Sequence, residues 1–325
     1  MMVLRAPTVR FLYGATALLV AGCFDANAPS GPTPGSPGFD GLRAFGLVEK
    51  QVAFGPRVPG APGHEAQLDW MLARLDSLAP EVLSDTFGHV SSAGDSLVLV
   101  NVMARFRPEL DRRIVILTHW DTRPTSDEAA DPARRSDPVP GANDGGSGTA
   151  VLLELAALMA ETPPPLGIDL LFVDGEDFGP NGEDMYLGAK RYARQIAVGE
   201  QVGARPLYGL LLDMVGDADL QIYYEKTGMR DANTKKLMID IWGVAARLGV
   251  REFVRRRKFE LTDDHLPLIH TARIPTCDII DYDYPNHSKG NIYWHTEADT
   301  LDKCSALSLA KVGYVVHSWL KAINR

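Results

Sequence analysis

The sequence predicts a single α/β domain with three layers (α/β/α), in which helices cover both faces of a mostly parallel (mixed) central sheet. Short apolar runs typical of buried strands occur at 114–117, 168–173 and 207–212. Segments with apolar residues at helical spacing separate them, at 147–159 and 185–196. Buried strands that alternate with helices are typical of parallel sheets covered on both faces.

The other elements follow from the same two patterns, helical spacing for helices and alternating or β-branched runs for strands. The segment 123–140 is polar and proline-rich, which predicts a long loop. In chain order we also expect a helix at 64–78, strands at 82–87 and 96–106, a strand at 219–224, a helix at 234–248, a strand at 274–280 and a closing helix at 307–323.

The first residues carry a processing signal. Arg5 and Arg10 precede an apolar run at 11–20, which is too short to span a membrane as a mature helix. The sequence Leu-Val-Ala-Gly-Cys that ends at Cys23 resembles the bacterial lipoprotein box, with Val20 where leucine is most usual. It implies cleavage before Cys23 and a lipid on the Cys23 sulfur. The alternative is an ordinary secretory signal with an incidental cysteine.

The segment that follows Cys23 is rich in Pro, Gly, Ser and Ala, which predicts a flexible tether. The expected organisation is a signal peptide at 1–22, the lipidated cysteine and tether at 23–40, and the folded domain at 41–325. On this prediction the protein is an exported bacterial lipoprotein of the cell envelope, which reaches the membrane through its lipid only.

The composition excludes some classes of function. The chain has 325 residues, 45% of them hydrophobic and 23% charged, which is ordinary for one large globular domain. The net charge is -9 and the one basic run, at 255–258, is short, so we expect a solvated face there and no nucleic-acid partner. Cys277 and Cys304 lack the CxxC spacing of a thiolate zinc site, and their spacing leaves a disulfide open.

A set of acids and histidines gathers where the predicted strands end. Asp144 lies in a glycine-rich loop at 141–148 that opens into an apolar helix, and alone it would be explained as a helix cap. Because ligands bind at the carboxyl ends of parallel strands, the recurrence of such residues there favours a site. The other members are His119, Asp121, Glu176, Asp177, Asp213 and His295.

These residue types suit a zinc site. Zinc binds histidine nitrogens and carboxylate oxygens, and a catalytic zinc keeps one position open. The candidate ligands are His119, Asp144, Asp177, Asp213 and His295. Glu176 stands beside a candidate ligand and could act as acid and base, and Asp121 could support His119 from behind. Each residue alone also has a structural explanation as a surface acid, a cap or a buried histidine.

Rival motifs are incomplete. The glycines at 145–148 are not followed by the Lys-Ser/Thr of a phosphate-binding loop. Ser147 lacks the Gly-x-Ser-x-Gly spacing of a nucleophile elbow. These absences argue against phosphate binding and against a serine nucleophile.

Six motifs in order carry a family resemblance: HWD at 119–121, GANDGGSG at 141–148, DGED at 174–177, LLDMVGD at 211–217, TDDHLP at 262–267 and YWHTEADT at 293–300. Together they resemble the zinc aminopeptidase superfamily. Within it, the chain is most similar to the glutaminyl-peptide cyclotransferases (glutaminyl cyclases) of animal type, which include bacterial forms. The resemblance covers 41–325 and implies a zinc-dependent catalytic domain.

The cyclases imply one zinc ion, held by Asp144, Asp177 and His295. Glu176 would then shuttle the proton with Asp213 and Asp263 as its hydrogen-bonded partners, and Trp294 would wall the substrate pocket. The aminopeptidases imply two zinc ions about 3.5–4 Å apart. In that case Asp144 bridges the two ions, and His119 and Asp213 complete the second site.

The chain departs from these families in two places. Glu176-Asp177 stands where Glu-Glu is usual, and the segment 178–186 lacks the tryptophan of the animal cyclases. Either Phe178 or Tyr186 takes the place of that tryptophan, or the pocket is built differently. Three further tyrosines could exclude water from the pocket or simply pack near the surface; they are Tyr282, Tyr284 and Tyr293.

The resemblance leads to one main hypothesis and two alternatives. The main hypothesis is a glutaminyl-peptide cyclotransferase, which converts N-terminal Gln of peptides or proteins to pyroglutamate and releases ammonia. The first alternative is a zinc aminopeptidase that hydrolyses N-terminal residues. The second is a lipoprotein that uses the fold only for binding, which a broken ligand set would favour. We expect a monomer that acts on peptide N-termini.

Overall fold

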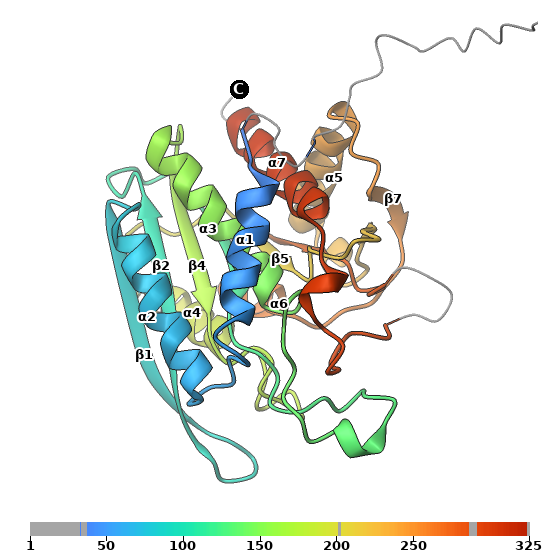
Figure 1. The fold of residues 1–325 in the computed structure, drawn as a ribbon. Helices are drawn as coiled ribbons and strands as arrows, with labels where there is room; N and C mark the ends of the chain where they lie inside the picture. The colour runs from blue at the N-terminus through green and yellow to red at the C-terminus, as the bar shows by residue number, and fades with distance from the viewer. Residues whose placement is uncertain (1–32, 34–37, 201–202, 286–290, 324–325) are drawn as a thin grey trace, which may run out of the picture.

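The computed structural model describes residue 33 and residues 38–200, 203–285 and 291–323 (Figure 1). The predicted signal peptide, Cys23 and most of the predicted tether lie outside the described residues. The main sheet has six strands in the order β1-β2-β4-β3-β5-β8, and two further strands, β6 and β7, pair beside it. The strands are β1 (Glu81–Val90), β2 (Ser96–Phe106), β3 (Arg113–His119), β4 (Gly167–Val173), β5 (Tyr208–Asp213), β6 (Ile222–Tyr224), β7 (Phe253–Arg257) and β8 (Thr276–Ile280).

The sheet is parallel on one side and antiparallel on the other. β3 pairs in parallel with β4 and β5, and β5 pairs in parallel with β8. The β1–β2 hairpin joins the opposite edge, where β2 runs antiparallel to β4. Every residue of β3 and β4 is buried, because helices cover both faces of these central strands. The prediction of a mostly parallel, mixed sheet is confirmed.

Helices form the two outer layers (Figure 1). The larger core lies under α1, α2, α3, α5 and α7, and the smaller core joins the other face of the sheet to α4 and α6. The helices are α1 (Gly41–Val52), α2 (Pro62–Asp76), α3 (Gly146–Glu161), α4 (Leu187–Val198), α5 (Ala232–Arg247), α6 (His265–His270) and α7 (Ala306–Ala322), and single 3-10 turns are η1 (Pro132–Arg134), η2 (Gly228–Arg230) and η3 (Leu301–Lys303).

One expected strand is shorter than predicted. The segment 219–224 forms only β6, which leaves the main sheet and pairs with β7. The arginines of β7 are exposed, as predicted for a solvated basic run at 255–258. Cys277 and Cys304 are both buried and free within the described chain.

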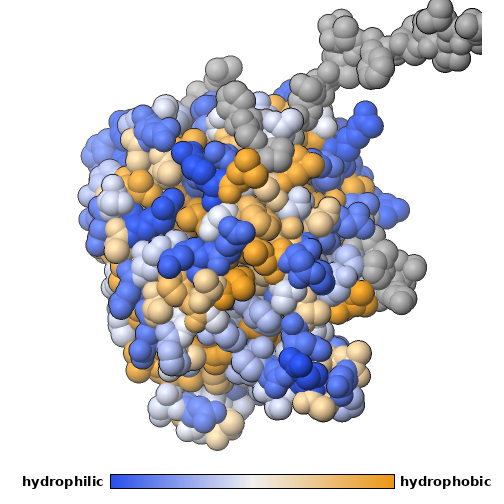
Figure 2. Space-filling model, in the orientation of Figure 1, coloured by the Kyte–Doolittle hydropathy of each residue, from blue (hydrophilic) through white to orange (hydrophobic). Residues whose placement is uncertain are grey.

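The surface is mixed in polarity. Figure 2 shows hydrophilic and hydrophobic side chains interspersed over one face of the molecule. Within the described ranges, no helix is long and apolar enough to cross a bilayer.

Candidate metal centre and active site

The carboxyl ends of the central strands carry the predicted site residues. His119 is the last residue of β3 and Asp213 the last residue of β5. Glu176 and Asp177 lie in the turn after β4, and Asp144 precedes the first turn of α3. All five are buried. The sheet thus brings residues from four chain segments to one rim, as the strand ends predicted.

The first group of candidate metal ligands joins Asp144, Asp177 and His295, whose ligand atoms lie within 4.8 Å of one another. His295 Nε2 is 3.2 Å from Asp177 Oδ1 and 3.9 Å from Asp144 Oδ2. The Oδ2 atoms of both aspartates are buried without a hydrogen-bond partner. Buried carboxylate oxygens without a donor are rare, and beside a histidine nitrogen they fit a bound cation.

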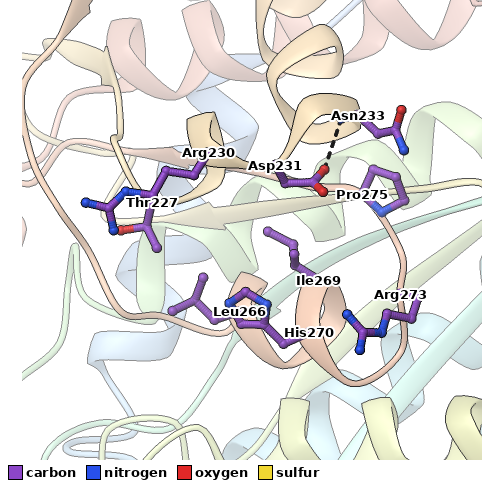
Figure 3. A pocket seen from close by; sticks show the side chains of 9 residues that line it. All are labelled: Thr227, Arg230, Asp231, Asn233, Leu266, Ile269, His270, Arg273 and Pro275. Carbon is purple, nitrogen blue, oxygen red and sulfur yellow. Dashed lines mark hydrogen bonds between the residues drawn. The ribbon is translucent and has the colours of Figure 1, made fainter.

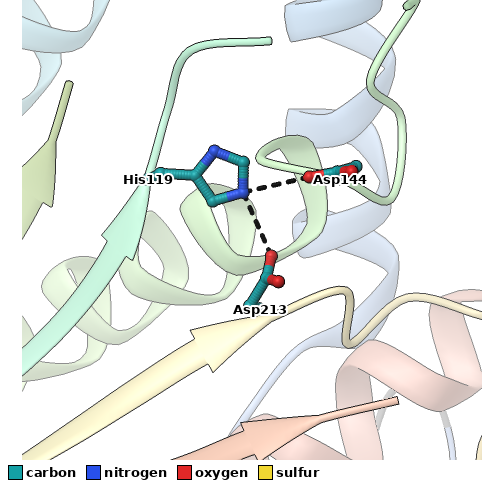
Figure 4. Close-up of side chains that lie close together, drawn as sticks. All are labelled: His119, Asp144 and Asp213. Carbon is teal, nitrogen blue, oxygen red and sulfur yellow. Dashed lines mark hydrogen bonds and ion pairs between the residues drawn. The ribbon is translucent and has the colours of Figure 1, made fainter. Parts of the chain in front are cut away.

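A second group shares Asp144 with the first. His119 Nε2 lies 3.1 Å from Asp144 Oδ1 and 3.1 Å from Asp213 Oδ1 (Figure 4). Asp144 therefore presents one oxygen to each group. This arrangement would suit one metal ion with a hydrogen-bonded histidine beside it, or two ions bridged by Asp144.

A small pocket opens onto both groups. Its volume is about 60 Å³, and Glu176, Asp213 and Asp263 all line it. The Trp294 ring stacks on the His295 ring with 3.7 Å between centroids, and the Tyr282 ring meets Trp294 edge-on. Trp294 therefore forms one wall of this pocket.

Tyr186 forms another wall of the pocket. It lies in the segment 178–186, where the animal cyclases carry a tryptophan. It lines the pocket, and its hydroxyl donates to the Thr262 carbonyl oxygen at 2.9 Å. Phe178 packs elsewhere, against Leu97, Leu99 and Leu187. The alternative that Phe178 replaces the tryptophan is therefore wrong.

The two remaining tyrosines pack instead of lining the pocket. Tyr284 is fully buried and its hydroxyl donates to Asp299 Oδ1 at 2.9 Å. The Tyr293 ring lies edge-on against the Tyr284 ring. Of the three tyrosines at 282, 284 and 293, Tyr282 is the one that lines the pocket.

Two buried aspartates fix the backbone that carries the ligands. Asp121 accepts hydrogen bonds from the backbone N–H groups of Glu176 and Asp177 at 3.1 and 3.2 Å. Asp299 accepts from the N–H groups of Asn143 and Asp144 at 2.9 and 3.1 Å. Asp121 also lies 3.6 Å from His119 Nδ1, so it supports both the histidine and the turn.

Sequence reasoning did not single out Asp299, nor the ion pair described below between buried Arg123 and partly exposed Asp127. Asp299 lies inside the YWHTEADT motif, and Arg123 follows HWD by two residues. Their position within or beside motifs was the available signal. Their buried partners could not be read from the chain.

A larger hollow lies elsewhere on the molecule. It measures about 520 Å³ and lies between α6 and the start of α5 (Figure 3). Asp231 lines this hollow, but as the N-cap of α5 its side chain already accepts hydrogen bonds from the backbone N–H groups of Asn233 and Thr234. None of the candidate ligands named above lines this hollow, so the smaller acidic pocket is the candidate functional site.

Comparison with known proteins agrees with this geometry. The model of peptidase family M28 matches residues 101–320. The chain belongs to peptidase family M28. The matched segment runs from β2 to α7 and includes every candidate ligand from His119 to His295.

Solved structures similar to this M28 member include proteins described with two kinds of activity. A Zn-dependent exopeptidase from Parabacteroides distasonis is 33% identical, with a TM-score of 0.83, and the match covers 89% of this chain and 99% of that one. The glutaminyl cyclase of Porphyromonas gingivalis is 36% identical, with a TM-score of 0.82 and coverage of 88% and 99%. A Drosophila melanogaster glutaminyl-peptide cyclotransferase is 25% identical over 75% of this chain and 70% of its own length.

The electrostatics of this M28 site favour bound protons or a cation. Burial raises the pKa of Glu176 well above its ordinary value; Asp177 and Asp263 raise it further, and His119 opposes them. Burial and the neighbouring Asp213 likewise raise the pKa of Asp263. Burial alone would lower the pKa of His119, but the nearby carboxylates of Asp121, Asp144 and Asp213 raise it well above its ordinary value.

Proposed function

We propose that this M28 member is a zinc-dependent glutaminyl-peptide cyclotransferase, which converts N-terminal Gln of a peptide to pyroglutamate and releases ammonia. The observation that carries the proposal is the narrow pocket beside the candidate metal ligands. Its aromatic walls leave about 60 Å³, and Trp294 stacks directly on His295. Such a pocket suits one planar side-chain amide, and holding that amide close to the α-amine favours an intramolecular reaction.

The candidate ligands for the zinc are Asp144, Asp177 and His295. When bound, zinc would polarise the side-chain amide carbonyl as a Lewis acid. The chain's own residues would do the rest of the work. Trp294 and Tyr282 hold the amide against the ligand group, and the buried acids Asp213 and Asp263 face the peptide's α-amine.

Glu176 moves the proton in this reaction. The neutral α-amine forms a bond to the side-chain carbonyl carbon and gives one proton to the Glu176 carboxylate. The carbon–nitrogen bond of the amide then breaks, and Glu176 returns that proton to the departing nitrogen, which leaves as ammonia. No water is consumed. A buried glutamate with a raised pKa is suited to both halves of this transfer.

A zinc aminopeptidase is the second candidate. The observation that favours it is the second ligand group, His119, Asp144 and Asp213, with Asp144 placed to bridge two ions. The Zn-dependent exopeptidase of Parabacteroides distasonis supports the same alternative. Paired metals about 3.5–4 Å apart would activate a water, with Glu176 as its base.

A paired peptide assay distinguishes the two candidates. The purified protein with zinc is incubated with a peptide that begins with Gln and with the same peptide beginning with Leu. We expect loss of ammonia from the Gln peptide and no change in the Leu peptide. Release of free Leu would instead establish the aminopeptidase.

A further inference from the structure

We propose that Arg123 is a positioning residue for the metal ligands, which holds Asp177 directly and His295 through Asp127. The inference rests on the metal site of the proposed function and deepens it. It explains how two candidate ligands from distant parts of the chain keep one geometry. Arg123 lies in the long loop after β3, whereas Asp177 follows β4 and His295 lies near the C-terminal helix.

The Arg123 guanidinium makes charge-assisted hydrogen bonds in two directions. Nη1 donates to Asp177 Oδ1 at 2.8 Å and to the Asp177 carbonyl oxygen at 3.4 Å. Nε and Nη2 donate to Asp127 Oδ1 and Oδ2 at 2.7 and 2.8 Å, a bidentate pair. The Arg123 side chain is only 5% exposed. Its planar fork therefore fixes both carboxylates relative to each other.

The contact with Arg123 gives the two carboxylate oxygens of Asp177 different surroundings. Oδ1 accepts from Arg123 and also lies 3.2 Å from His295 Nε2, while Oδ2 is buried and has no hydrogen-bond partner. Oδ2 is thus left for a metal ion. A buried carboxylate is costly without a counter-charge, and Arg123 supplies that charge whether or not a metal is bound.

Asp127 links Arg123 to His295. Its Oδ1 lies 3.7 Å from His295 Nδ1, on the ring edge opposite the candidate metal position. The neighbouring residue of the same loop also holds the backbone, because Glu128 N–H donates to the His295 carbonyl oxygen at 3.2 Å. A carboxylate beside Nδ1 favours the proton on that nitrogen, which leaves Nε2 free to bind metal.

Gly179 provides the room that Arg123 needs. It has a φ of +61°, and a Cβ at this position would lie 2.7 Å from Arg123 Nη1 and 2.9 Å from Nη2. Any side chain would therefore displace the guanidinium or the turn. Gly179 follows Asp177 by two residues, so the turn that presents the ligand also accommodates the arginine that holds it.

The test measures zinc affinity by competition with a chelator, in four full-length proteins: wild type, Arg123→Met, Asp177→Asn and the double variant. We expect Arg123→Met to weaken zinc binding about 10–100-fold, the range typical of groups that orient metal ligands. In the Asp177→Asn background the same change should have a smaller effect, because the carboxylate that Arg123 holds directly is gone and only its contact with His295 through Asp127 remains. A purely structural role would give equal losses in both backgrounds.

Three further variants complete the experiment. Arg123→Lys, which keeps the charge but loses the fork, and Gly179→Ala should each weaken zinc binding in the same direction, so the test does not depend on one variant folding. Arg134→Gln is the matched control, because Arg134 pairs with Asp137 in the same loop and is half-exposed. Its zinc affinity should stay at the wild-type value.

Two results would overturn the inference. Unchanged or tighter zinc binding in folded Arg123→Met would remove the positioning role while leaving the proposed function intact. A wild-type protein that binds no zinc at all would overturn the metal site and this inference together. The wild-type measurement therefore separates the two failures.

Discussion

At the scale of residues, Glu176 differs from the other acids of the rim in its contacts. Asp144 and Asp177 each present a buried oxygen without a partner to the ligand group, whereas Glu176 belongs to neither of the two groups of candidate metal ligands described above. Burial keeps its pKa high. This difference is the one expected between a residue that transfers protons, as proposed for Glu176, and residues that bind a metal ion.

Replacing Glu176 by Gln should separate chemistry from metal binding. We expect Glu176→Gln to keep its zinc and to lose about 10²–10⁴-fold in kcat/KM, the range of a lost acid–base group. Zinc content and kinetics are measured on the same preparation. Glu183→Gln, an exposed glutamate on the same loop, is the control and should retain full activity. Near-normal turnover in Glu176→Gln would remove the assigned role.

The candidate ligands should behave in the opposite way. Asp144→Ala and His295→Ala should each lose bound zinc as well as activity, because each removes one of three ligands. Metal analysis after dialysis measures the loss. Full zinc occupancy in either variant would exclude that residue as a ligand.

The raised pKa of Glu176 should affect how kcat/KM falls as the pH is lowered. The base must be ionised, so activity is present above its pKa and lost below it. The substrate α-amine must also be neutral, with a pKa of about 7.7–8.0. We expect log kcat/KM, measured with excess zinc, to fall with slope one below the amine pKa. A second break is expected at a pH above 4.5, the ordinary pKa of a glutamate. Below that break the slope should be two, because both the amine and Glu176 are then protonated. A slope of one down to that pH would contradict the prediction.

At the scale of elements, α3, the helix that follows the glycine-rich loop, packs closely against the ends of β3 and β5. A Cβ at Gly148 in α3 would meet Thr118 Oγ1 at 2.2 Å and the Leu212 carbonyl oxygen at 2.3 Å. α3 therefore packs against the ends of β3 and β5 at their closest approach. This contact helps to place Asp144 between the residues that end those strands.

Gly148→Ala should therefore destabilise the fold by about 1–3 kcal/mol, the usual cost of overpacking. Gly46→Ala is the matched control, because Gly46 lies within α1 and a Cβ there meets nothing within 4 Å. It should gain about 0.5–1 kcal/mol from better helix propensity. Thermal unfolding of both variants measures the difference, and equal stability of the two would contradict the packing described here.

The sequence predicted the elements with a strong pattern and missed those without one. The buried strands β3, β4 and β5 were visible because both of their faces are covered, which makes the runs continuously apolar. α1 was missed; two glycines interrupt its pattern, and its start depends on Asp40, whose side chain caps it. α6 has six residues, too few to show a helical period.

The same reasoning explains which site residues could be predicted. Candidate ligands stand at strand ends and in the turns that follow, where a single sequence shows them. Arg123 contacts Asp177, 54 residues away in the chain, and Asp299 contacts Asp144, 155 residues away. Only the fold brings these residues together. Their roles could not be derived from local pattern.

At the scale of the whole molecule, one fold of peptidase family M28 accommodates two reactions. The chain is about as similar to a Zn-dependent exopeptidase as to a glutaminyl cyclase, at 33% and 36% identity. The rim residues are compatible with both, since an acid–base glutamate beside metal ligands serves hydrolysis and cyclisation alike. The pocket above the rim, with Trp294, Tyr282 and Tyr186 as its walls, is the feature on which the choice depends.

The decisive property of the proposed reaction is that no water enters the product. The most direct test incubates the protein with zinc and a peptide that begins with Gln in water enriched in ¹⁸O, and follows the products by mass spectrometry. We predict a product lighter than the substrate by one ammonia and free of ¹⁸O. Free glutamine together with a shortened peptide, with ¹⁸O in the new carboxylate, would contradict the cyclase and establish hydrolysis.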